Sequence, residues 1–261
     1  MTPAFVLTYH AVERGEGPLF VDEETFARHL DCIVASGAEA VTVSELVARL
    51  RSGALRRPTV AVTFDDGIAS VAHIAAPLLV ERGLPATIFC VAGHLGGTND
   101  WPSALPGATP LELAGAEGLA MLARQGFEIG CHGMTHAPLP SCRAADLWHE
   151  LVSARDALEQ VVQAPVRAYA YPYGAVPARE GRRAVAAAFE SAWTTVIREI
   201  VYGADLHELP RVDAHYFRDV PKLARALERG LEPSLRIRGL ASRTRRGVRK
   251  DYRRRVWGRS A

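Results

Sequence analysis

Two aspartates stand side by side where an apolar stretch ends. Asp65 and Asp66 follow "TVAVTF" (59–64), and Gly67 comes directly after them. Asp and Gly are ordinary turn residues, and an Asp in this place also suits the cap of a following helix. The pair by itself is therefore weak evidence of chemistry, and its meaning depends on polar residues elsewhere in the chain.

Two histidines supply such residues. His132 and His136 stand four positions apart in "HGMTH", directly after the apolar stretch "FEIGC" (127–131). On a helical turn, residues with this spacing share a face, so both imidazoles would reach one point. With one aspartate they make three nitrogen and oxygen ligands, which is typical of a catalytic Zn²⁺ site that keeps one position for water. Co²⁺ and Ni²⁺ also suit these ligands.

A metal would divide the work between the two aspartates. Like charges this close raise one carboxyl pKa, whereas a divalent cation offsets the repulsion and keeps both carboxylates ionised. One aspartate could then bind the metal while the other accepts a proton from water, whose pKa the metal lowers to about 7. The pattern therefore indicates hydrolysis of an amide or an ester.

The elements that must position these residues alternate between short apolar runs, which predict strands, and stretches with a period near 3.6, which predict helices. The expected strands are 4–12, 38–43, 59–64, 86–93, 127–131, 166–174, 192–197 and 207–215. The expected helices are 22–36, 44–53 (capped by Ser44 and ended by Gly53), 69–83 (kinked at Pro77), 111–125, 143–163, 178–190 and 220–230. About seven βα units predict an α/β fold with a parallel sheet, either a barrel or doubly wound. In both, the chemistry gathers at the C-terminal ends of the strands.

Composition and charge divide the chain in two. The 261 residues are 48% hydrophobic and 23% charged, which is ordinary for a soluble globular protein, and no apolar run approaches the roughly 20 residues that cross a bilayer. No secretory signal peptide is recognised at the N-terminus, so a cytoplasmic location is expected. Residues 236–261 hold eleven Lys or Arg against one Asp, whereas residues 1–235 are mildly acidic. We therefore expect a (β/α) domain over 1–235 and a basic tail over 236–261.

Three motifs occur in an order that resembles a known family. "TFDDG" (63–67), "HGMTH" (132–136) and "YPYG" (171–174) are similar to the signature motifs of the polysaccharide deacetylases, carbohydrate esterase family 4, or NodB-homology domains. "YH" near the N-terminus and "LPR" later in the chain match a subset of that family. The resemblance covers about residues 5 to 215. It implies a distorted, incomplete (β/α) barrel and a substrate that is an N-acetylated amino sugar, in a polymer or a lipid-linked glycan.

The resemblance also implies a role for each motif residue. Asp65 resembles the catalytic base and Asp66 a metal ligand, and His132 and His136 resemble the other two ligands. The base would take a proton from the metal's water, which attacks the acetamide carbonyl. Acetate and a free amine would be the products.

Substrate contacts are expected from "YPYG" and from two tryptophans. Beside Pro172, the backbone N–H of Tyr173 would help to bind the oxyanion and its ring would line the groove. Taken alone, "YPYG" is also an ordinary Pro/Gly turn. Trp193 resembles the aromatic residue of the family's acetyl pocket, with core packing as the alternative. Trp101 lies in a long loop, where it would stack on a sugar or hold the loop in place.

Two departures from the family pattern move roles to other residues. The usual motif has an Arg before the Pro that holds the catalytic Asp; none stands there, and Arg211 is the expected replacement. The usual catalytic acid is a His in a Leu-x-His context late in the chain, which has no clean match. We prefer His10, at the end of the first strand, over His215, His207 or no protein acid at all.

The expected function is a metal-dependent N-deacetylase acting on an amino sugar of a bacterial glycan. Because of the two departures, hydrolysis of another non-peptide C–N bond and glycan binding without catalysis remain as alternatives. The basic tail 236–261 is expected to lie on the anionic inner face of the membrane, close to a lipid-linked or membrane-assembled glycan. A solvated basic tail is the alternative. Nucleic-acid binding is not expected, because the enzyme-like body gives it no support.

Overall fold

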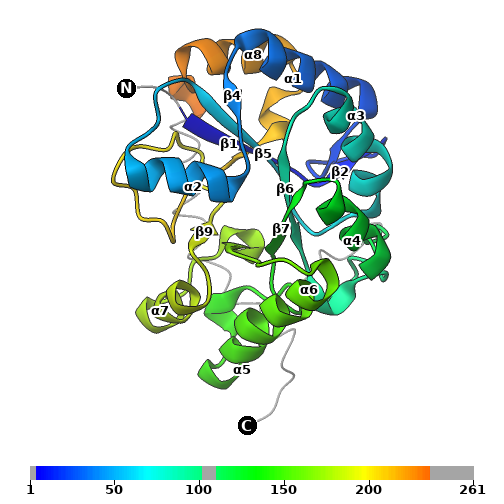
Figure 1. The fold of residues 1–261 in the computed structure, drawn as a ribbon, viewed down its shortest axis with the longest axis vertical. Helices are drawn as coiled ribbons and strands as arrows, with labels where there is room; N and C mark the ends of the chain where they lie inside the picture. The colour runs from blue at the N-terminus through cyan, green and yellow to red at the C-terminus, as the bar shows by residue number, and fades with distance from the viewer. Residues whose placement is uncertain (1–3, 102–109, 236–261) are drawn as a thin grey trace.

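The computed structural model describes residues 4–101 and 110–235, built around a parallel sheet (Figure 1). Its strands are β1 (Ala4–Tyr9), β4 (Glu39–Ala40), β5 (Thr59–Phe64), β6 (Ala86–Cys90), β7 (Glu128–Cys131), β8 (Ala168–Ala170), β9 (Ser191–Trp193) and β10 (Val212–Asp213). They lie in the order β10-β1-β5-β6-β7-β8-β9, with β4 also paired to β5. Two short strands, β2 (Ala11–Val12) and β3 (Phe20–Val21), pair with each other outside this sheet.

The two edges of the sheet curl toward each other. Leu209 forms a parallel bridge to Trp193 of β9, and shortly afterwards Val212 pairs with Leu7 of β1. The segment 209–213, which we call the closing segment, therefore touches both edges. This arrangement confirms the predicted incomplete (β/α) barrel of about seven parallel strands.

Helices cover the outside of the sheet (Figure 1). They are α1 (Glu23–Ser36), α2 (Val43–Ser52), α3 (Ala76–Glu81), α4 (Ala116–Arg124), α5 (Ala144–Trp148), α6 (Ala154–Val162), α7 (Arg179–Ala188) and α8 (Val220–Arg229). Two π-helical segments, η1 (Val71–Ala75) and η4 (His149–Ser153), lead into α3 and α6, and short 3₁₀ turns are η2 (Ala92–His94), η3 (Leu139–Ser141), η5 (Pro172–Gly174) and η6 (Ala214–Phe217). Within the two described ranges, no helix has both the length and the apolar character needed to cross a membrane.

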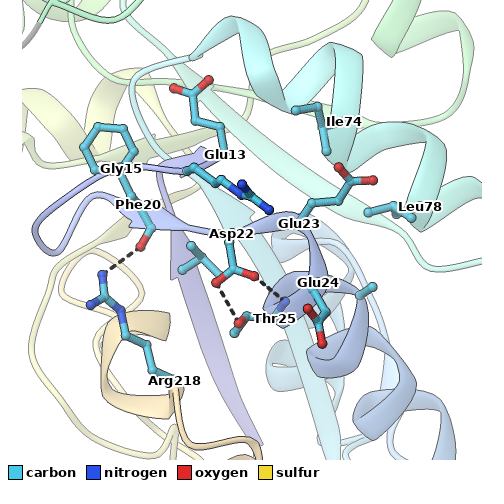
Figure 2. A pocket seen from close by; sticks show the side chains of 13 residues that line it. Glu13, Gly15, Phe20, Asp22, Glu23, Glu24, Thr25, Ile74, Leu78 and Arg218 are labelled. Atoms are coloured by element: carbon cyan, nitrogen blue, oxygen red, sulfur yellow. Dashed lines mark hydrogen bonds between the residues drawn. The ribbon is translucent and has the colours of Figure 1, made fainter.

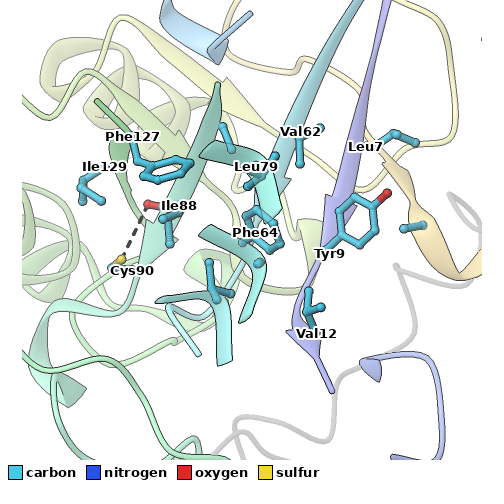
Figure 3. Packing of buried hydrophobic residues seen from close by; sticks show 14 of the residues in the cluster. Leu7, Tyr9, Val12, Val62, Phe64, Leu79, Ile88, Cys90, Phe127 and Ile129 are labelled. Atoms are coloured by element: carbon cyan, nitrogen blue, oxygen red, sulfur yellow. Dashed lines mark hydrogen bonds between the residues drawn. The ribbon is translucent and has the colours of Figure 1, made fainter. Parts of the chain in front are cut away.

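The strand β5 separates two apolar cores, which explains its unbroken apolar sequence. Val62 and Phe64 pack outward with the helical layer, where Leu79 of α3 joins them (Figure 3). Ala61, which points to the other face, belongs to a second cluster that includes Trp193. All six residues of β5 are buried, so the strand holds whatever follows it in a fixed place.

The helix α2 differs from the prediction at its start. Thr42, and not Ser44, caps it by accepting a hydrogen bond from the N–H of Glu45 at 3.2 Å. The Ser44 hydroxyl instead donates to the Glu128 carboxylate of β7. Gly53 ends the helix in the left-handed conformation, φ 66°, as predicted. A local pattern could not distinguish two hydroxyl residues two positions apart, because a contact with the distant strand β7 engages Ser44.

Three longer predictions also change. The predicted helix 111–125 starts only at Ala116, because Leu113 is engaged in an antiparallel bridge to Ile68. The predicted helix 143–163 is a continuous helical body, but η4 interrupts its α-helical hydrogen bonding. The predicted strand 207–215 shortens to β10, since its pairing is shared between two different strands.

Candidate active site

The aspartate and histidine candidates lie directly beyond the C-terminal ends of β5 and β7, which flank β6 in the same parallel sheet. The N–H of Asp65 donates to the Tyr9 carbonyl at 2.9 Å, which extends the pairing of β5 with β1. The N–H of His132 likewise donates to the Cys90 carbonyl at 2.8 Å, beyond the pairing of β7 with β6. Their backbones are therefore fixed by the sheet, and the side chains converge at one rim of the barrel.

Asp66, His132 and His136 form a buried cluster that could hold a metal ion. One ligand atom of each lies within 4.8 Å of the others. Asp66 Oδ1 is 3.5 Å from Nε2 of His132 and 3.3 Å from Nε2 of His136. Among the described residues it has no hydrogen-bond partner, although it is buried. The Nδ1 of His132 donates to the Ala170 carbonyl at 2.8 Å, which leaves its Nε2 for a cation.

The backbone brings these side chains together through left-handed residues. Asp66 has φ 70° and His136 has φ 57°, in a region that residues other than glycine seldom adopt, although Asp and His do so more often than most. Gly133 of the same turn has φ 88°. The predicted helical turn from His132 to His136 is therefore wrong. The two imidazoles still meet, because the left-handed residues reverse the chain and aim both rings at Asp66.

Burial and charge set the protonation of this cluster. Burial works to raise the pKa of Asp66, but the neighbouring imidazoles, that of His136 above all, hold it below its usual range. Burial lowers the pKa of His132 to about 4. A carboxylate beside a neutral imidazole is the state in which both groups bind a metal ion.

Asp65 is held separately from this cluster, by Arg211 of the closing segment. The guanidinium donates to both carboxylate oxygens, at 2.6 Å and 2.8 Å, and both side chains are buried. The Nε of Arg211 donates to the Thr194 carbonyl at 3.1 Å, and its guanidinium lies over the Phe89 ring. Burial works to raise the pKa of Asp65, but the charge and hydrogen bonds of Arg211, together with the charges of His132 and His10, hold it below its usual range. Asp65 is thus an oriented, ionised carboxylate next to the cluster.

The three histidines proposed as the acid have different surroundings. His10 follows β1, and its charge acts on Asp65, on Asp66 and on Asp213 of β10. Its Nδ1 is buried and, in the described part of the chain, has no hydrogen-bond partner. His215 lies beside Asp213, whose carboxylate accepts its backbone N–H at 2.8 Å. His207 is engaged elsewhere, since its Nε2 lies 3.0 Å from the Phe189 carbonyl.

Aromatic rings enclose His136. Trp101 stacks on its imidazole with ring centres 4.1 Å apart, and Tyr173 presents its ring at 4.7 Å and 71°. Tyr173 is partly exposed and has φ 58° in η5, which starts at the buried Pro172. Trp101 is buried, although it lies in a long loop. The sequence did not predict its contact with a histidine of the site.

Trp193 lies inside the barrel and not on a groove. Its side chain is fully buried in the second core cluster, and its indole N–H donates to the Ser191 hydroxyl at 3.1 Å. These contacts favour core packing over the acetyl-pocket role expected from the sequence.

Two cavities lie between elements of the described part of the chain. One of about 990 Å³ is bounded by the start of α1, by β3 and by η1 with α3, and its wall is rich in acidic side chains such as Glu13 and Glu23 (Figure 2). The other, of about 490 Å³, is lined by Gly174, Thr194 and Pro210, next to η5 and the closing segment. Neither is lined by the metal-ligand candidates.

Comparison with known proteins agrees with this geometry. Residues 52–192 match the family model described as polysaccharide deacetylase. YxkH of Bacillus subtilis (strain 168), provisionally named a polysaccharide deacetylase, is 23% identical over 172 residues, or 65% of this chain and 56% of that protein. The chitooligosaccharide deacetylase of Sinorhizobium fredii (strain NBRC 101917 / NGR234) is 29% identical over 119 residues, or 45% of this chain and 47% of that protein. The chain thus spans about half the length of these curated relatives.

A solved structure shares the fold. IcaB from Ammonifex degensii superposes with a TM-score of 0.72 at 23% identity, over 87% of this chain and 98% of that one. The (β/α) architecture is therefore common to both chains over most of their length.

Proposed function

The chain belongs to the polysaccharide deacetylase family, and we propose that it is a metal-dependent hydrolase that removes N-acetyl groups from an amino sugar in a polysaccharide or a lipid-linked glycan. The observation that carries this proposal is that a metal-ligand set and a separately held carboxylate lie at one rim of the barrel. Asp66 lies with two histidines in a set of metal-ligand type, while Asp65 stays outside that set, ionised and oriented by Arg211. Hydrolysis of an amide needs both functions.

Asp66, His132 and His136 would hold one divalent metal, Zn²⁺ with Co²⁺ or Ni²⁺ as alternatives. Bound there, a metal supplies the positive charge that polarises an amide carbonyl and lowers the pKa of water. Asp65 accepts the proton of the water that attacks the acetamide carbon. Arg211 donates to both oxygens of this carboxylate, so the orientation of Asp65 is fixed while it accepts the proton.

The remaining steps belong to Tyr173 and His10. The backbone N–H of Tyr173 donates to the oxygen that becomes negative as the carbonyl is attacked, and the ring of Tyr173 borders the sugar. His10 donates a proton to the amine nitrogen as the C–N bond breaks, which releases acetate and a free amino sugar. The electrostatic influence of His10 on both Asp65 and Asp66 favours it over His207, whose ring is engaged away from the rim.

Acetate release tests the function directly. The protein, loaded with Zn²⁺, is incubated with N-acetylglucosamine oligomers of different linkage and length, and acetate is measured against an Asp65→Asn control. We expect acetate from at least one oligomer with the unaltered protein and about 10²-fold less with the control. Binding of an oligomer without acetate release would favour the glycan-binding alternative. Ammonia or another acid in place of acetate would favour hydrolysis of a different C–N bond.

The basic tail 236–261 lies outside the described residues, and its role is proposed from sequence. With eleven Lys or Arg and one Asp, it would contact the anionic cytoplasmic face of a membrane and bring the rim near a lipid-linked glycan. We therefore propose that the protein is cytoplasmic and peripheral on the inner face of the membrane.

A further inference from the structure

Glu150 is a buried carboxylate that no step of the proposed reaction uses. It lies in η4, between α5 and α6, and only 4% of it is exposed. Its Oε2 accepts the N–H groups of Met134 and Thr135, at 3.0 Å and 3.2 Å, and its Oε1 accepts the Thr135 hydroxyl at 2.5 Å. A charged group in this environment is retained only where its hydrogen bonds are satisfied, and all three partners are donors.

The segment that Glu150 contacts is the turn between His132 and His136. The opposite side of the turn is held as well, because the carbonyls of Gly133 and Met134 accept the N–H groups of Ala92 and Gly93, at 3.0 Å and 2.9 Å. The N–H groups of the turn thus point to Glu150 and its carbonyls point to the segment after β6. Both kinds of backbone group are used, so the turn has one favoured position.

This turn determines where the imidazole of His136 points. His136 directly follows Thr135 and has the left-handed φ of 57°, a strained conformation for a non-glycine residue that persists only where the surroundings impose it. Glu150 also approaches the backbone closely, since a Cβ on Gly133 would lie only 2.9 Å from Oε2. The carboxylate and the turn therefore fit as one packed unit.

We infer that Glu150 is a positioning residue for the metal site, acting through the 133–135 turn to fix the direction of His136. Glu150 is not part of the cluster of metal-ligand type, and its oxygens are occupied by the turn. The inference rests on the proposed function, because it requires that the cluster binds a metal. Partners that orient metal ligands in this way commonly change affinity by 10- to 100-fold when they are removed.

Metal affinity, and not activity, is the measurement. Zn²⁺ affinity is determined by competition with a coloured chelator for the unaltered protein, Glu150→Ala and Glu150→Gln. Glu159→Ala is the matched control, because Glu159 is another helical carboxylate that accepts a loop N–H, that of Val166 at 2.9 Å. The visible spectrum of the Co²⁺-loaded proteins reports the ligand geometry, which a loss of stability alone would not change.

We expect Glu150→Ala to bind Zn²⁺ at least about 10-fold more weakly and to change the Co²⁺ spectrum. Glu150→Gln should stay within about threefold, because its amide oxygen can accept both N–H groups while the Thr135 hydroxyl turns to accept from the amide NH₂. Glu159→Ala should bind like the unaltered protein. If Glu150→Ala does not fold, as judged by circular dichroism, Glu150→Asp replaces it, since the shorter side chain loses reach but keeps the charge.

The outcomes separate the inference from the proposed function. Unchanged affinity in Glu150→Ala, or in Glu150→Asp where that variant is used, would overturn the role of Glu150 and leave the metal site standing. Equal losses in Glu150→Gln and Glu150→Ala would also overturn it, because the hydrogen-bond geometry would then not be the cause. An unaltered protein that binds no Zn²⁺ would overturn the proposed function together with the inference.

Discussion

Arg211 holds both oxygens of Asp65, at 2.6 Å and 2.8 Å, across a separation of 146 residues. Two parallel hydrogen bonds fix the plane of the carboxylate as well as its position. The pair is buried, so each charge depends on the other for its stability in the barrel. The relationship therefore links the orientation of the proposed base to the stability of the fold.

Arg211→Ala is expected to damage both properties. Asp65 would lose its orientation and remain as an uncompensated buried charge, which typically costs about 3–5 kcal/mol of unfolding free energy. Acetate release should fall by about 10-fold or more, while the metal content stays stoichiometric, because Arg211 contacts none of the three ligands. Denaturant unfolding, acetate assay and elemental analysis measure the three effects.

The matched control for Arg211 is Arg182→Ala. Arg182 forms an ion pair with Glu208 at 2.6 Å, but on the surface, where such pairs add little to stability. An Arg211→Ala protein with the rate of the unaltered protein would mean that Arg211 does not orient the base.

The two aspartates should separate in their effects. Asp65→Asn keeps the shape of the side chain but removes the proton acceptor, so turnover should fall by about 10²-fold or more while the metal remains. Asp66→Asn should lose metal as well as turnover, since a charged ligand is replaced by a neutral one. Elemental analysis of both proteins beside the acetate assay is the measurement. Loss of metal from Asp65→Asn alone would show that the assignment is reversed.

The two histidines should determine metal content and heat stability together. His132→Ala and His136→Ala should each lower metal occupancy well below stoichiometric, with the surface substitution His73→Ala as the control. Because metal binding favours the folded state, chelator should lower the unfolding temperature of the unaltered protein and added Zn²⁺ should restore it. Neither chelator nor added Zn²⁺ should shift the unfolding temperature of His132→Ala or His136→Ala as far as that of the unaltered protein. Full occupancy in both variants would remove the site from consideration.

His29 gives the fold a predictable pH dependence. Burial lowers its pKa, and the neutral ring is used on both sides: Tyr9 donates its hydroxyl to Nδ1 at 2.9 Å, and Nε2 donates to the Phe217 carbonyl at 2.8 Å. The pKa of His29 in the folded state lies below the unfolded value of about 6.5. The stabilisation that the neutral His29 ring gives to the fold is therefore complete above about pH 6.5, and it is lost as the pH falls toward the folded pKa.

The substitution His29→Gln tests this linkage. Urea unfolding of both proteins at pH 7.5 and pH 5.5 should show that the unaltered protein has the larger unfolding free energy. The difference between the two unfolding free energies should be smaller at pH 5.5. The reason is that only the unaltered protein must keep a histidine neutral against protonation. If the difference in unfolding free energy is the same at both pH values, the pH dependence belongs to groups other than His29.

The basic tail is tested by vesicle co-sedimentation. The full chain should bind vesicles that contain anionic lipid, because each basic residue near such a surface contributes about 1 kcal/mol. Raising the salt should weaken this binding, because salt screens the charges. A chain without residues 236–261 should stay in the supernatant. Equal binding by the shortened chain, or no binding by the full chain at low salt, would rule out the membrane role.

The strand ends of the site were predictable because their signals are local. The run before Asp65 and Asp66 is apolar throughout, and β5 ends at Phe64 as expected. The His132–His136 pair was found from its spacing, but its backbone was predicted as a helical turn. Spacing alone cannot reveal the left-handed φ values that produce the same convergence.

Other parts of the site depend on distant contacts. Arg211 was proposed from resemblance, since no pattern near it refers to a carboxylate on β5. Glu150 gave no signal, because a glutamate in a helix is usually a solvated surface residue. The strand predicted over 207–215 was too long for a similar reason: the closing segment pairs with two strands in turn and cannot follow one register.

The closing segment has a consequence for the order in which the protein is assembled during synthesis. The metal-ligand candidates, which follow β5 and β7, leave the ribosome well before Arg211 does. A nascent chain that ends before the closing segment would contain all three ligands, yet Asp65 would face the interior without its partner. The proposed base is therefore completed by the same event that brings the two edges of the sheet together, so that the proposed hydrolytic activity would report on the finished barrel.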